Sequence, residues 1–250
     1  MTDRSARDRL LRRFYPEVEF GGYPSICPDT QFFLRVNAVL RPEHTALDLG
    51  CGRGIDEATP LLSSLKTLKG KCRHVLGLDV DPGAASNPRI DEFRLIEGER
   101  WPVEPASVDL IMCRYVVEHI EFPDRFFEEC RRVLRVGGVI ALITSNLHSY
   151  FGLAVRLIPN RMHARAVRYA HSSTSREEQD VFPTFHRCNS VGRLGRLLRN
   201  HGFHACVYGQ KAPPNYLEFS SLAYACGVVY ERFVPCRFQP SLVAFARRES

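Results

Sequence analysis

The chain has 250 residues, of which 44% are hydrophobic and 10% aromatic, and this composition excludes an intrinsically disordered protein. An excess of 34 basic over 28 acidic residues gives a formal charge of +6, too small to indicate nucleic acid as a partner. The charged N-terminus lacks the apolar core of a secretory signal, and the longest later apolar run, 222–230, is too short to span a membrane. Nine scattered cysteines form no CxxC pair, which predicts reduced thiols, no metal site and a cytoplasmic protein.

The first 44 residues precede any strand-like run. Apolar residues at Phe32, Phe33, Val36 and Val39 follow a helical period and predict a helix there. We therefore expect residues 1–44 to form a helical lid.

Short apolar runs then alternate with helix-sized stretches. Such runs are typical of central parallel strands, because helices cover both faces of the sheet. Two further strands are predicted near the C-terminus. The predicted fold is α/β: a doubly wound, Rossmann-like, mostly parallel seven-stranded sheet with helices on both faces. The expected strands are 45–50, 74–79, 93–98, 108–113, 139–144, 204–211 and 242–248.

We expect a single domain, since no internal repeat or flexible linker divides the chain. Residues 1–44 would be the lid, 45–144 the ligand-binding core, 145–189 an insertion on the acceptor side, and 190–250 a helix and strands that complete the sheet.

Two amphipathic stretches predict helices with recognisable ends. The first would begin at Asp124 as its cap and end at Gly137. The second would begin at Ser190 and stop at Gly202.

A glycine-rich loop, DLGCGRG, follows the first predicted strand. Glycines let a backbone approach a ligand closely, and loops of this kind most often suggest a dinucleotide. The dinucleotide fingerprint GxGxxG, however, needs a glycine at the position of Ile55, and Asp48 would repel a pyrophosphate. A nicotinamide-dependent reductase is therefore disfavoured.

Asp79 ends the second predicted strand, where a carboxylate can accept both hydroxyls of a ribose. Together with Asp48, it implies a ligand that has a ribose and a positive charge but no phosphates. S-adenosylmethionine has these properties.

The linked runs DLGCGRG, VLGLDVDP and ERWPVEPASVDLIMCRYVVEHIEFPDRFFEECRRVLRVGGVIALIT resemble the class I S-adenosylmethionine-dependent methyltransferases, in particular the type 11 group. The resemblance covers about residues 40–144. It implies that the methionine end of the cofactor lies against the glycine loop, that Asp79 binds the ribose, that Val80 lies against the adenine, and that Glu99 or, failing it, Glu97 meets the adenine amino group. The residues that it places at the methionine end are Asp48, Gly50, Cys51, Gly52 and Gly54, with Cys113 and Arg114 between cofactor and substrate.

Methyl transfer is an in-line displacement, so alignment in a dry pocket supplies much of the catalysis and a base is optional. For a hydroxyl acceptor, a histidine or carboxylate near the strand ends would remove the proton. His148 is the first candidate and His119 the second, with Glu118 and His186 as further candidates.

The region 131–176 holds eight arginines and three histidines but no Asp or Glu. It favours an anionic acceptor, such as a nucleotide sugar or lipid phosphate, or peripheral contact with the inner membrane surface through residues 150–171. A solvated helical cover explains the same pattern.

Two functions fit these patterns. The leading prediction is a methyltransferase that acts on a small-molecule, glycan or lipid-linked acceptor, at oxygen. The alternative is a catalytically silent binding module of the same fold, associated with a membrane or an assembly partner. Nucleic acid is not expected, because residues 113–116 read CRYV where base-methylating enzymes carry a D/N-PPY tetrad.

Overall fold

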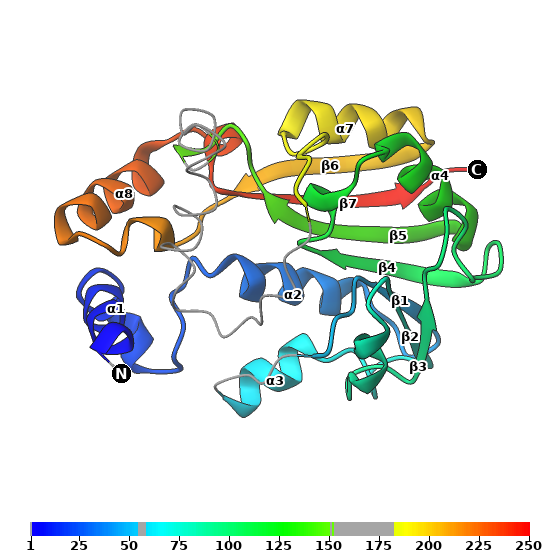
Figure 1. The fold of residues 1–250 in the computed structure, drawn as a ribbon, viewed down its shortest axis with the longest axis horizontal. Helices are drawn as coiled ribbons and strands as arrows, with labels where there is room; N and C mark the ends of the chain where they lie inside the picture. Colours follow the sequence, from blue (N-terminus) through cyan, green and yellow to red (C-terminus); the bar gives the residue numbers. More distant parts are fainter. Residues whose placement is uncertain (1, 55–58, 151, 153–182) are drawn as a thin grey trace. The chain divides into compact units, whose positions relative to one another are not determined.

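The computed structural model describes residues 2–54, 59–150, 152 and 183–250 (Figure 1). Its strands are β1 (Thr45–Leu49), β2 (His74–Asp79), β3 (Glu92–Leu95), β4 (Val108–Arg114), β5 (Leu134–Ser145), β6 (Phe203–Gln210) and β7 (Ser241–Arg248). Its α-helices are α1 (Thr2–Phe14), α2 (Pro28–Val39), α3 (Pro60–Lys66), α4 (Pro123–Val133), α7 (Val191–Asn200) and α8 (Ser221–Phe233). Short 3-10 turns include η2 (Pro82–Ser86) and η3 (Val117–His119).

The chain divides into two compact units, each described here by itself. The sheet unit comprises residues 29–145, 184–208 and 242–250. The second unit comprises residues 1–28, 146–183 and 209–241, and its described part contains α1 and α8.

The seven strands form one sheet in the order β3-β2-β1-β4-β5-β7-β6, which confirms the predicted fold class (Figure 1). The β1–β2, β1–β4, β2–β3 and β4–β5 pairs are all parallel. In register, Leu47 lies beside Leu76 on one side and Ile111 on the other. Because these strands run the same way, the residues that follow their carboxyl ends share one edge of the sheet.

Alternating strand residues supply two apolar layers, and helices cover both. On one face, α4 and α7 pack against the sheet through residues such as Phe127 and Leu198, which are fully buried (Figure 1). On the other face, α2 packs through Phe32 and Phe33. Burying each such side chain stabilises the fold by roughly 1.5–3 kcal/mol.

The predicted ends of the fourth-strand helix are wrong. Helix α4 starts with Pro123 after a Phe122 N-cap that makes no side-chain cap hydrogen bond, and it ends at Val133. Between the pairs Val108–Leu134 and Leu110–Val139, β4 advances two residues and β5 advances five. Gly137, with φ of +81°, lies in this irregular stretch, so its left-handed backbone serves a bulge rather than a helix stop. In α7 the predicted ends hold, with Ser190 at the N-cap and Gly202 just past the helix at φ of +74°.

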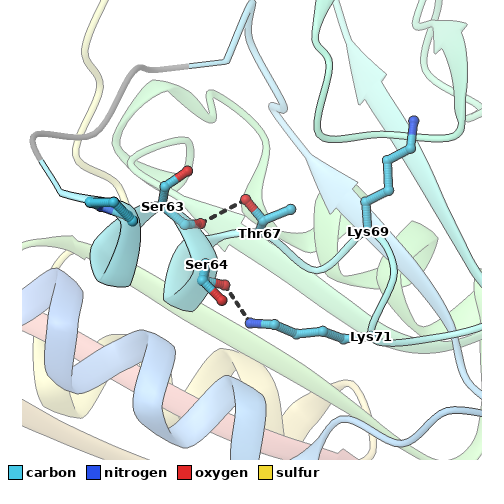
Figure 2. A pocket seen from close by; sticks show the side chains of 6 residues that line it. Ser63, Ser64, Thr67, Lys69 and Lys71 are labelled. Carbon is cyan, nitrogen blue, oxygen red and sulfur yellow. Dashed lines mark hydrogen bonds between the residues drawn. The ribbon is translucent and has the colours of Figure 1, made fainter.

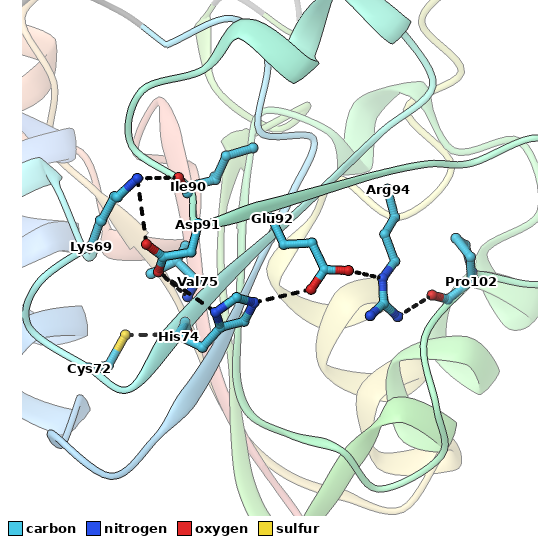
Figure 3. A network of polar contacts seen from close by, with 9 residues as sticks. All are labelled: Lys69, Cys72, His74, Val75, Ile90, Asp91, Glu92, Arg94 and Pro102. Carbon is cyan, nitrogen blue, oxygen red and sulfur yellow. Dashed lines mark hydrogen bonds and ion pairs between the residues drawn. The ribbon is translucent and has the colours of Figure 1, made fainter.

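The edge strand β3 is fastened to β2 by a polar network at the amino ends of the two strands (Figure 3). Asp91 accepts a 2.8 Å hydrogen bond from Val75 N, and His74 Nε2 lies 3.3 Å from Glu92 Oε2. Glu92 in turn accepts from Arg94 Nε at 2.6 Å, and that contact lowers the pKa of Glu92. These residues lie at the amino ends of the strands, whereas the glycine loop lies at the carboxyl ends, and their role is to hold β3 against β2.

In the second unit, α1 and α8 share a small apolar core that contains Tyr15, Val18 and Tyr224. Helix α8 buries Tyr224, Gly227 and Glu231, a helical spacing. Burial raises the pKa of Glu231 to about 7. One carboxylate oxygen accepts a 3.3 Å hydrogen bond from Ala212 N, and the other has no hydrogen-bond partner within the described part of the chain.

Candidate functional site

The glycine loop after β1 is wound in the left-handed region. Gly50, Gly52 and Gly54 have φ values of +70°, +54° and +81°. Leu78 O accepts hydrogen bonds from Gly50 N at 2.7 Å and Cys51 N at 3.2 Å, which fixes the loop against the end of β2. A Cβ on Gly50 would stand 2.2 Å from Val116 Cγ2, so only glycine fits there. No atom of the described residues lies within 4 Å of a Cβ at Gly52, which leaves that face of the loop open to them.

Asp79 is joined to the glycine loop across the sheet edge. Its Oδ2 accepts a 2.8 Å hydrogen bond from Gly52 N, and its Oδ1 accepts a 3.0 Å bond from Asp81 N. The sequence predicted that the glycine loop and this acid share one ligand, and the structure brings them into direct contact.

Asn87 is a residue of the site that the sequence reasoning missed. Its buried side chain donates from Nδ2 to Cys51 O at 2.8 Å and to Gly52 O at 3.1 Å. It therefore holds the carbonyl side of the loop while the amide of Gly52 faces Asp79. Nothing in the sequence marks an asparagine 35 residues beyond the loop for this role.

Asp48 lies near the end of β1, two residues before the first glycine of the loop, and is partly buried. Burial raises its pKa to about 6, the positive charge of Arg114 opposes that shift, and the negative charge of Asp79 adds to it. A buried carboxylate in this state is stabilised by a positively charged ligand nearby.

The two cysteines and the arginine of the predicted site differ in what they can offer. Burial raises the pKa of the Cys51 thiol to about 12 and that of Cys113 well above its usual range, so neither is a thiolate at neutral pH. The Cys113 side chain is fully buried in the core layer facing α4, which leaves only its backbone at the sheet edge. Arg114 is partly buried, forms a 3.5 Å ion pair with Asp29 and lies 4.9 Å from the ring centre of Phe33.

The residues predicted to meet the adenosine lie on the β2–β3 side of the edge. Val80 follows β2 and is 54% exposed. Ile96 N donates a 2.8 Å hydrogen bond to Asp79 O, which brings Glu97 next to the end of β2. Glu99 is exposed and forms an ion pair with Arg125 of α4.

The candidate bases fall in different units. His148, in the second unit, is exposed and donates from its backbone N to Asn146 Oδ1 at 3.0 Å. His119 and Glu118 lie on η3 in the sheet unit, and His186 is hydrogen-bonded there through its backbone to Glu118 O at 3.0 Å. Glu118 itself is buried and accepts a 2.6 Å hydrogen bond from Thr144.

A pocket of about 370 Å³ opens along α3, and none of the predicted cofactor-binding or catalytic residues lines it (Figure 2). Its two lysines are engaged by the protein: Lys71 Nζ donates to Asn37 Oδ1 at 2.7 Å, and Lys69 Nζ donates to Ile90 O at 2.7 Å. We assign it no ligand. Its lining residues are Pro60, Ser63, Ser64, Thr67, Lys69 and Lys71.

Several predictions concern residues outside the described part of the chain. Ile55 is among them, as is nearly all of the proposed membrane-contact segment 150–171. Within the described residues, no helix is long and apolar enough to cross a bilayer, and no cluster of three or more His, Cys, Asp or Glu side chains is arranged to hold a metal ion.

The chemistry of the edge fits S-adenosylmethionine. An open left-handed loop at Gly52 admits close approach of a ligand, the Asp79 carboxylate suits ribose hydroxyls, and Asp48 suits a cationic methionine end. The Oδ2 of Asp79 that now bonds Gly52 N retains further acceptor capacity, because a carboxylate oxygen has two lone pairs.

Comparison with known proteins finds methyltransferases among the similar chains. Residues 47–142 match the family described as a methyltransferase domain. A probable S-adenosylmethionine-dependent methyltransferase of Mycolicibacterium smegmatis is 34% identical over 167 residues, or 62% of this chain and 59% of the relative. A ubiquinone biosynthesis O-methyltransferase of Paraburkholderia phytofirmans is 26% identical over 180 residues, or 64% of this chain and 74% of the relative. The chain thus spans about three-fifths of the length of the first of these relatives.

Solved structures share the fold. The putative methyltransferase in complex with the Haloferax volcanii Trm112 methyltransferase activator superposes with a TM-score of 0.55 at 18% identity, covering 100% of this chain and 98% of that one. The YcgJ protein of Bacillus subtilis gives a TM-score of 0.52 at 14% identity, covering 88% of this chain and 99% of that one. The methyl donor of the matched family is S-adenosyl-L-methionine. Residues 47–142 therefore match a methyltransferase domain, and this part of the chain is similar to S-adenosylmethionine-dependent methyltransferases.

Proposed function

We propose that this protein transfers the methyl group of S-adenosylmethionine to oxygen of a small-molecule, glycan or lipid-linked acceptor. The observation that carries the proposal is the contact between Gly52 N and Asp79 Oδ2, which joins the donor loop to the ribose acid. The O-methyltransferase among the relatives supports oxygen as the acceptor atom.

At the methionine end, Asp48, Gly50, Gly52 and Gly54 would hold the cofactor, and Cys51 would contribute its backbone. Asp79 would bind the ribose and Val80 would cover the adenine. Glu97 is a better partner for the adenine amino group than Glu99. Ile96, the residue before Glu97, donates a backbone hydrogen bond to Asp79 O, which brings Glu97 near the ribose acid. The Glu99 carboxylate, by contrast, forms an ion pair with Arg125.

Arg114 would supply positive charge near the acceptor, and Cys113 only its backbone. The ion pair with Asp29 offsets part of the positive charge of Arg114. The charge that remains is compatible with an anionic acceptor but does not require one. His148 and His119 remain candidates for the proton acceptor.

Release of S-adenosylhomocysteine in a coupled assay tests the proposal, with phenols, sugars, nucleotide sugars, lipids and small acids offered in turn. We expect one acceptor class to stimulate release, and we expect the Asp79→Asn variant to lose that stimulation. Cofactor binding without stimulation by any of these classes would contradict a small-molecule acceptor. Failure of the wild-type protein to bind the cofactor would contradict the methyltransferase assignment itself.

Peripheral membrane contact through residues 150–171 stays a prediction. Flotation with anionic vesicles tests it: salt-sensitive binding is expected, and no binding at low salt would contradict it.

A further inference from the structure

His186 occupies an unusual backbone conformation beside the end of β4. Its φ is +50°, in the left-handed region that side chains other than glycine seldom adopt. Residues held in such conformations cost on the order of 1–3 kcal/mol and persist only where the surroundings fix them. Two hydrogen bonds do so here, since Phe185 N and His186 N both donate to Glu118 O, at 2.8 Å and 3.0 Å.

A buried polar network anchors the same segment to two strands. Asn189 Nδ2 donates to Thr144 Oγ1 at 2.8 Å and to Ser145 O at 3.1 Å, and Thr144 donates to Glu118 Oε2 at 2.6 Å. Glu118, Thr144 and Asn189 are each at least nine-tenths buried. The carboxyl ends of β4 and β5 thereby fix where His186 lies.

This segment adjoins the donor loop through η3. Val116, which begins the turn that carries Glu118 and His119, is the residue that a Cβ on Gly50 would strike. The contacts from Gly50 to Val116, then to Glu118 and His186, all lie within the sheet unit. His148, by contrast, belongs to the second unit and is exposed.

The surroundings keep the His186 ring neutral. Burial lowers its pKa below the usual value, and the neighbouring His119 lowers it further. Its Nδ1 is buried and has no hydrogen-bond partner among the residues that the structure describes, so none of these stabilises an imidazolium through that nitrogen. Charged groups near the segment include Glu118, which is hydrogen-bonded to Thr144, the 3.5 Å ion pair of Arg187 with Glu121, and Arg193, whose positive charge acts on Cys188.

Resting on the proposed function, we propose that His186, rather than His148, accepts the proton of the acceptor hydroxyl. When bound, S-adenosylmethionine supplies a methyl group on a positively charged sulfur. As the acceptor oxygen forms its bond to the methyl carbon, the carbon–sulfur bond breaks and its electron pair returns to sulfur, which becomes neutral. The hydroxyl proton passes to Nε2 of His186 and then to solvent.

The test needs no identified acceptor. The pKa of His186 is measured by NMR in two complexes: one with S-adenosylhomocysteine, whose sulfur is neutral, and one with sinefungin, which carries an ammonium group where the methylsulfonium stands. A ring beside the transferring methyl should have a lower pKa in the sinefungin complex, by about half a unit to one unit, because the nearby positive charge disfavours imidazolium. The His186→Asn variant assigns the resonance, and asparagine suits the left-handed backbone.

His204, exposed on β6, is the internal control, and its NMR resonances should be the same in both complexes. Equal pKa values for His186 would overturn this inference while leaving the proposed function standing. Failure of both ligands to bind in calorimetry would overturn the proposed function and this inference with it. With the acceptor found by the release assay, His186→Asn should lower kcat 10²- to 10⁴-fold at neutral pH and leave cofactor affinity unchanged. An unchanged kcat would also overturn the inference.

Discussion

The backbone N–H of Gly52 donates a 2.8 Å hydrogen bond to Oδ2 of Asp79, which lies 27 residues further along the chain. This contact couples the conformation of the glycine loop to the acid at the end of the neighbouring strand. A ligand that takes up the carboxylate therefore also meets the open, left-handed backbone of the loop.

Two matched substitutions distinguish the effect of the glycine loop on stability from its effect on ligand binding. Gly52 and Gly70 both have positive φ, and neither has an atom within 4 Å of an added Cβ. Gly52→Ala and Gly70→Ala should each cost about 1–2 kcal/mol in the free energy of unfolding, measured by urea denaturation. Only Gly52→Ala should weaken binding of S-adenosylhomocysteine in calorimetry. Equal affinities in the two variants would show that the ligand does not approach Gly52.

Asp48 should make cofactor affinity depend on pH. Its pKa of about 6 in the free protein means that it is largely ionised at pH 7.5 and largely protonated at pH 5. A cationic ligand prefers the ionised form, so affinity for S-adenosylmethionine should fall as the pH is lowered through about 6, approaching tenfold per pH unit. Calorimetry between pH 5 and pH 8 measures this. In Asp48→Asn the slope should vanish, and an unchanged slope would assign the titration to another group.

Glu231 should make the protein less stable at high pH. Its folded-state pKa, about 7, exceeds its ordinary value of 4.5, so its contribution to stability is complete below pH 4.5 and is lost as the pH rises through 7. Glu231→Gln keeps an acceptor for Ala212 N and has no charge to bury. Thermal unfolding should show the variant to be more stable than wild type by about 3 kcal/mol at pH 8, and no more stable at pH 4. A gain of equal size at both pH values would contradict a buried ionisable carboxyl.

Much of the fold follows from patterns that are local in the sequence. The first five strands of the sheet were predicted by apolar runs, because strands covered on both faces need one, and the last two as strands that complete the sheet. Helix α4 was predicted in the right place, but its end was predicted wrongly. Gly137 satisfies the rule for a helix stop and lies in a bulge of β5 instead. Local pattern cannot distinguish these two uses of a left-handed glycine.

The donor side of the site was likewise accessible, since Asp48, the glycines and Asp79 sit at fixed distances from strand ends. Contacts between distant segments were not. On the donor side, the role of Asn87 depends on a hydrogen bond to the glycine loop 35 residues away. Near the candidate bases, the role of Asn189 depends on a hydrogen bond to Thr144, 45 residues away, and the left-handed backbone of His186 has no sequence signal. Only the packed structure joins those segments.

The most direct test of S-adenosylmethionine-dependent function compares two aspartates by calorimetry with S-adenosylhomocysteine. Asp79 and Asp91 each accept a 2.8 Å hydrogen bond from a backbone amide, but Asp79 lies at the carboxyl end of β2 and Asp91 at the amino end of the neighbouring β3. Wild type should bind at submillimolar concentration, Asp79→Asn should bind at least tenfold more weakly, a loss of about 1.4 kcal/mol, and Asp91→Asn should bind as wild type does. Absence of binding by wild type, or an equal loss in the two variants, would contradict the account.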